Sequence, residues 1–188
     1  MTTINETPTE APESLQFWWE AGITWDHYLG DEIEEHIDLW TGIYRRTVTP
    51  DWALGEVERI GRDWKLIVIA EDWCGDASNL APIFARLVED SPRIELRIVK
   101  RDDHPQLMDL YLTNGSRSIP IVVIMDEAFR PVGRWGPRPA ELQEFVIREK
   151  RAGDRPASEI YKDTRRWYAR DSGETTLREV LAVMADVA

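Results

Sequence analysis

The sequence predicts an α/β fold, in which a central mixed β-sheet is flanked by helices and extended by further helices at both ends. Residues 66–70 form a continuous, partly β-branched apolar run, as expected of a strand buried on both faces. Between residues 64 and 150, strand-like and helix-like patterns follow one another in the order β-α-β-α-β-β-α. Outside this region, apolar residues recur at the three- and four-residue spacing of amphipathic helices.

These patterns divide the chain into four parts. Residues 1–12 are polar and contain two prolines, which predicts a flexible arm. Residues 13–63 form a helical extension, with one helix starting at Gly30 and Asp31 and another at 52–62; Pro50 separates them. Residues 64–150 form the α/β domain. Residues 151–188 form a helical tail with helices at 157–170 and 175–187.

Within the α/β domain, the apolar spacing predicts helices at 77–88, 105–112 and 140–150. Residues 94–99 alternate apolar and charged side chains, which is typical of a half-buried strand. Residues 119–125 form the next strand, and residues 131–135 its antiparallel neighbour.

The charge of the chain is unevenly spread. The net charge is −12, and residues 1–44 contain ten carboxylates without a lysine or arginine. This segment is either a solvated helix face or a docking surface for a basic partner. Nucleic acid is not expected as a partner, because its binding needs Lys and Arg to neutralise phosphates.

The single cysteine allows no internal disulfide, which favours a reducing compartment and hence the cytoplasm. No secretory signal is recognised at residues 1–13, and the apolar runs are too short to cross a bilayer, so no membrane association is expected. His27, His36 and His104 are scattered, so we expect neither a metal site nor another cofactor. Five of the nine tryptophans precede residue 64; they either pack the N-terminal helices onto the domain or form a lid near the cysteine.

The candidate catalytic residue is Cys74, which lies where the first strand gives way to a helix. Free N–H groups and the positive end of the helix dipole favour its thiolate, the nucleophilic form. Gly75 permits close approach of a substrate backbone. The carboxylates of Glu71, Asp72 and Asp76 oppose ionisation of the thiol, and the sequence does not decide which effect is larger.

The sequence Trp-Cys-Gly-Asp-Ala at residues 73–77, the segment 101–120 and Trp-Gly-Pro-Arg-Pro at residues 135–139 resemble the thioredoxin-like superfamily, specifically thioredoxin family proteins with a single-cysteine motif. The resemblance implies the thioredoxin fold and a cis peptide bond before Pro120. It also implies that the Ile119 backbone pairs with an extended substrate and that Trp73 forms an apolar lip. The expected substrate-binding residues are Trp73, Gly75, Asp76, Ile119 and Pro120.

The chain departs from the dithiol pattern at two positions. Ala77 stands where a second cysteine would lie, and Val68 stands where thioredoxins bury a carboxylate. The sequence therefore favours a monothiol redox protein, in which Cys74 attacks a protein disulfide or an oxidised low-molecular-weight thiol and an external thiol resolves the product. The alternative is a redox-inactive binding or adaptor module that uses the cleft between Cys74 and Pro120.

Three further side chains have two interpretations each. Asp76 is either a helix N-terminal acid or a participant in catalysis. Arg117 and Arg138 either pair with a substrate carboxylate or form surface salt bridges.

Overall fold

The computed structural model describes residues 12–188, so the arm predicted at 1–12 falls almost entirely outside the described residues. At the centre is a four-stranded sheet in the order β2-β1-β3-β4. Its strands are β1 (Trp64–Ala70), β2 (Ile94–Lys100), β3 (Ile121–Met125) and β4 (Pro131–Trp135). The β1–β2 pair is parallel, and the β1–β3 and β3–β4 pairs are antiparallel. The predicted α/β fold with a mixed sheet is confirmed.

Strand β1 forms the centre of the hydrophobic core. Every residue of this strand except Lys65 is buried, because helices cover both faces of the sheet around it. Val68 pairs with Ile98 on one side and Val122 on the other. The strand ends at Ala70, four residues before Cys74, so the core fixes the start of the segment that carries the cysteine.

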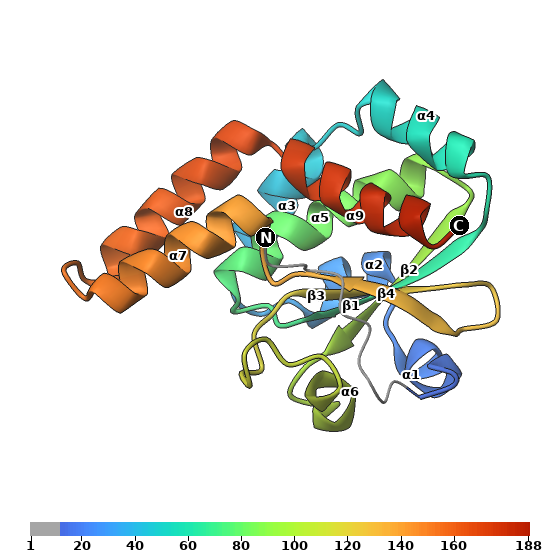
Figure 1. The fold of residues 1–188 in the computed structure, drawn as a ribbon, viewed down its shortest axis with the longest axis horizontal. Coiled ribbons are helices and arrows are strands. Elements are labelled where there is room, and N and C mark those ends of the chain that lie inside the picture. The colour runs from blue at the N-terminus through green and yellow to red at the C-terminus, as the bar shows by residue number, and fades with distance from the viewer. Residues whose placement is uncertain (1–11) are drawn as a thin grey trace.

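Helices surround the sheet unequally (Figure 1). Helices α3 (Ile37–Arg46), α5 (Gly75–Asp90) and α9 (Glu174–Asp186) lie on one side, and α1 (Gln16–Ala21) and α6 (Pro105–Asp109) lie on the other. Helices α7 (Ala140–Ala152) and α8 (Ala157–Asp171) form a pair that projects from the body of the molecule. The remaining helical elements are α2 (Trp25–His27), the π-helical turn η1 (Tyr28–Glu32) and α4 (Asp51–Ile60). No helix among the described residues meets the length and apolarity that a bilayer span requires.

The prediction of one helix starting at Gly30 and Asp31 is wrong. The π-helical turn ends at Glu32, α3 begins only at Ile37, and His36 between them has a positive φ of 59°. The Asp72 carboxylate accepts hydrogen bonds from the backbone N–H groups of Glu34 and Glu35, at 2.8 and 2.9 Å. This contact holds the interruption in place, because it gives two amide groups a partner outside a helix.

Three aromatic residues of the N-terminal segment, Trp25, Tyr28 and Trp40, are buried in the hydrophobic core. Trp40 is fully buried, and its ring lies within 6.2 Å of the rings of Trp25 and Tyr28, centre to centre. Its indole N–H donates to the backbone oxygen of Asp72 at 2.9 Å. The N-terminal segment therefore supports the chain just before Cys74.

The C-terminal tail is bonded to the domain through Glu179 of α9. Its carboxylate accepts from the Trp135 indole N–H at 2.6 Å and from the Ala140 backbone N–H at 2.9 Å. These bonds join α9 to the end of β4 and the start of α7. The tail is consequently part of the packed structure around the sheet.

Candidate functional site

Cys74 is the N-cap residue of α5 and lies against the backbone that precedes β3. Its Sγ accepts a hydrogen bond from the Ala77 N–H at 3.5 Å, and its S–H donates to the Ile119 carbonyl oxygen at 3.6 Å. The thiol is buried, with 8% of the residue exposed. The structure thus brings together two of the residues that the sequence singled out, Cys74 and Ile119.

Burial decides the protonation of Cys74. Burial, together with the Asp76 carboxylate, raises the pKa of the Cys74 thiol to about 11. Hydrogen bonding from the Ala77 N–H and the positive charge of Arg138 lower the pKa but do not compensate. The competition that the sequence left open therefore favours the protonated thiol, and the largest cause is desolvation.

This protonation state predicts slow modification of Cys74. Because only the thiolate reacts, iodoacetamide should alkylate folded protein at pH 7 at least about tenfold more slowly than urea-unfolded protein. The rate in the folded state should keep rising through pH 9 without a plateau. Intact-mass measurements across pH 6–10 test this, and a plateau below pH 8 would contradict a pKa of about 11.

Asp76 forms a buried ion pair with Arg138, next to the cysteine. Only 10% of the Asp76 side chain and 12% of the Arg138 side chain are exposed. The second carboxylate oxygen of Asp76 accepts from the Tyr168 hydroxyl at 2.7 Å, and Arg138 also donates to the Gln143 side-chain oxygen at 2.8 Å. Burial opposes the charge on Arg138, but the Asp76 carboxylate outweighs it and raises the pKa of the guanidinium.

The partners of Arg138 and Arg117 answer two of the open interpretations. Arg138 is neither a surface cation nor free for a substrate, because Asp76 already occupies it in the resting structure. Arg117 instead forms a two-point contact with Asp109 at the surface, at 2.7 and 2.8 Å. The sequence assigned no role in the site to Tyr168, because its partner Asp76 is 92 residues away.

The turn at Gly136 packs closely against the backbone of Pro120. Gly136 has φ of +120°, and a Cβ at this position would lie 2.4 Å from the Pro120 backbone oxygen. The Ile119–Pro120 and Gly136–Pro137 peptide bonds are both cis. The close approach of the two segments therefore requires glycine at position 136.

The variant Gly136→Ala should destabilise the protein by about 1–3 kcal/mol, because alanine combines a disfavoured φ with the clash against Pro120. Urea unfolding measures this change. Gly55→Ala is the matched control: Gly55 lies within α4, and outside the backbone of its own helix no described residue comes within 4 Å of the added Cβ. Equal stabilities of the two variants would refute the role of Gly136.

Two carboxylates before Cys74 have structural partners. Glu71 is buried and accepts from the Asp102 N–H at 2.7 Å, and burial raises its pKa. Burial opposes ionisation of Asp72, but hydrogen bonds from the Glu35 and Glu34 N–H groups outweigh it and lower its pKa. Both side chains thus hold the loop in place.

Trp73 and Tyr28 differ in their exposure to solvent. Trp73 is 41% exposed, and the Arg101 guanidinium lies 4.8 Å from its ring centre. Tyr28 is fully buried, and its hydroxyl has no hydrogen-bond partner among residues 12–188. Burial, together with Asp72, Glu71 and Cys74, raises the pKa of Tyr28 well above its ordinary value. Trp73 is therefore available to a ligand in the resting structure, and Tyr28 is not.

A helix N-terminal cysteine held against an Ile-Pro turn on a mixed sheet defines a thioredoxin-fold site. The thioredoxin family model matches residues 22–152, and the chain belongs to this family. Among solved structures, it is similar to an HIV epitope scaffold, with 21% identity and a TM-score of 0.70. It is also similar to a protein of unknown function from Pseudomonas aeruginosa, with 22% identity and a TM-score of 0.70.

Each of the two alignments covers 93% of this chain and 99% of the other. At these identities the likeness shows the fold alone. No match was found among curated proteins.

Proposed function

We propose that this thioredoxin-family chain is a monothiol redox protein with Cys74 as its nucleophile. The observation that carries the proposal is the contact of the Cys74 S–H with the Ile119 carbonyl oxygen at 3.6 Å. This contact joins the chain's one thiol to the backbone at which an extended substrate would pair. The proposed substrate-binding residues, which lie next to Cys74 or in the Ile-Pro segment, are Trp73, Gly75, Asp76, Ile119 and Pro120. The proposed location is the cytoplasm.

The chemistry is thiol–disulfide exchange in two steps. Cys74 sulfur attacks one sulfur of the substrate disulfide and forms a mixed disulfide; the other sulfur leaves as a thiol and takes the proton that Cys74 loses. An external thiol then attacks the substrate sulfur of the mixed disulfide. A disulfide forms between the external thiol and the substrate, the bond to Cys74 breaks, and the Cys74 sulfur leaves and takes the proton of the external thiol. The external step is needed because Ala77 offers no second sulfur and its side chain is buried.

The buried thiol makes the first step dependent on substrate docking. With a pKa of about 11, roughly one Cys74 in ten thousand is ionised at pH 7, since each pH unit below the pKa reduces the thiolate tenfold. A substrate N–H that pairs with the Ile119 carbonyl oxygen would displace the Cys74 S–H from this acceptor, and a thiol that loses this hydrogen bond ionises more readily. Docking at Ile119 is therefore the step that we expect to activate Cys74.

The burial and protonation of the Cys74 thiol also support a second candidate function. A thiol that is 8% exposed and protonated at neutral pH is compatible with a redox-inactive binding or adaptor module. Such a module would use the same cleft without forming a covalent bond. The two functions predict different behaviour of Cys74 toward disulfides.

The test is the formation of a mixed disulfide at Cys74 in folded protein. Oxidised glutathione and a disulfide-bonded peptide are each added at pH 7.5, and the adduct is followed by intact mass. A redox protein forms the adduct at least with the peptide and releases it when reduced glutathione is added. Urea-unfolded protein is the control for the chemistry of the thiol itself. If only the unfolded protein reacts with either disulfide, the redox proposal fails and the binding module is favoured.

A further inference from the structure

A hollow of about 440 Å³ lies between α3, α5 and α8. Its lining includes four aliphatic side chains and two arginines: Leu39, Ile43, Val48, Ile83, Arg46 and Arg165. No aspartate or glutamate lines it among the described residues, although the net charge of the chain is −12. We call it the arginine hollow.

No acidic residue in the described lining neutralises the two arginines of the arginine hollow. Arg46 and Arg165 are both exposed, and neither forms an ion pair with any residue in the range 12–188. The local chemistry therefore favours a ligand that supplies a carboxylate.

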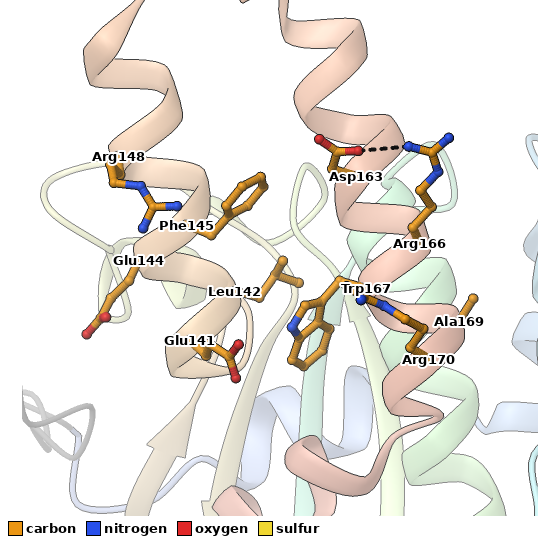
Figure 2. Close-up of a pocket in the computed structure, with 10 residues that line it drawn as sticks. All are labelled: Glu141, Leu142, Glu144, Phe145, Arg148, Asp163, Arg166, Trp167, Ala169 and Arg170. Carbon is orange, nitrogen blue, oxygen red and sulfur yellow. Dashed lines mark hydrogen bonds and ion pairs between the residues drawn. The ribbon is translucent and has the colours of Figure 1, made fainter.

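A larger hollow of about 770 Å³ between α7 and α8 provides the contrast (Figure 2). There the side chains of Leu142, Phe145 and Trp167 lie between the two helices. Three arginines of its lining are matched by three acids, and Arg166 pairs with Asp163 at 3.1 Å. Because the charges of its lining cancel, this larger hollow favours neither an anionic nor a cationic ligand. Cys74 does not line it.

The arginine hollow adjoins the first turns of the helix that carries Cys74. Asn79 lines the hollow and donates to the Gly75 backbone oxygen at 2.7 Å. Tyr168 also lines it and donates to Asp76. The step of four positions from Gly75 to Asn79 corresponds to about 6 Å along a helix axis. A polypeptide held beside Cys74 is thus within reach of the hollow.

We propose that the arginine hollow binds an acidic, partly apolar segment of the polypeptide whose disulfide Cys74 attacks. The choice of a polypeptide ligand rests on the proposed function. An open surface also favours it: Val48 is 78% exposed, whereas small-molecule sites bury most of their ligand. Arginine forks bind carboxylates at two points, and the apolar wall takes the neighbouring aliphatic side chain.

The probe is a short fluorescent peptide of alternating leucine and glutamate without cysteine, compared with a leucine–glutamine peptide of the same length. Fluorescence anisotropy measures the binding of each peptide. The test variant is Arg46→Gln with Arg165→Gln. Its matched control is Arg45→Gln with Arg166→Gln, which removes the same charge from neighbouring exposed positions outside the arginine hollow.

We expect the test variant to bind the acidic peptide at least about tenfold more weakly, because two charge-assisted contacts are lost. The control variant should change the affinity less than about twofold, and the glutamine peptide should bind wild type weakly. Equal affinities for the two peptides, or equal losses in the two variants, would overturn the inference. So would octanoate binding at the hollow without peptide binding, since it would show a small-carboxylate site.

The binding assay contains no disulfide, so its outcome is separate from that of the mixed-disulfide test. Peptide binding without adduct formation would support the acidic-peptide site and refute the redox function. Adduct formation without peptide binding would support the redox function and refute the acidic-peptide site.

Discussion

Replacement of Arg138 by methionine is expected to destabilise the protein by about 3–5 kcal/mol. The variant leaves the Asp76 carboxylate buried without its cation, and an uncompensated buried charge costs this much. It also removes the hydrogen bond from Arg138 to Gln143. Equilibrium urea unfolding measures the change.

Arg117→Met is the control for this substitution. Arg117 also forms an ion pair with an aspartate, but about half of each side chain in that pair is exposed. Surface pairs contribute about 0–1 kcal/mol, so this variant should be close to wild type in stability. Adding Asp76→Asn to Arg138→Met should recover part of the loss, because it removes the second buried charge. Similar stabilities of the Arg138 and Arg117 variants would show that the buried pair is not structurally important.

Replacement of Asp76 by asparagine should lower the pKa of Cys74 and speed its alkylation. The change removes a negative charge that raises the pKa, and it leaves the positive charge of Arg138, which lowers it. A shift of one pKa unit corresponds to about tenfold more thiolate at pH 7, and we expect an effect of at least this size. The pH dependence of iodoacetamide labelling, read by intact mass, gives the pKa.

Two further variants separate charge from a general loosening of the site. Tyr168→Phe removes the hydroxyl that binds Asp76 but keeps both charges, so the pKa of Cys74 should stay raised. Asp109→Asn removes a surface carboxylate that pairs with Arg117, and it should leave the labelling rate unchanged. If Tyr168→Phe accelerates labelling as much as Asp76→Asn does, exposure of the thiol rather than charge is the cause.

The interruption of the N-terminal helical segment at residues 33–36 could not be predicted from the sequence. The apolar spacing from Ile33 to Tyr44 correctly indicated helical structure but not its interruption at residues 33–36. The interruption depends on Asp72, whose bonds to Glu34 and Glu35 join positions 38 and 37 residues apart. Local periodicity carries no information about such a contact.

The sequence by itself determined the order of strands and helices in the domain, because each element has its own hydrophobic period. Through its motifs it also indicated a candidate site at Cys74 and at the Ile119–Pro120 segment. Only the tertiary structure decided the chemical state of that site. The thiol is protonated because folding removes it from water, and Asp76 is fixed by Arg138 and Tyr168, which lie 62 and 92 residues further along the chain. Burial and long-range pairing depend on how elements pack together, and no local pattern in the chain records them.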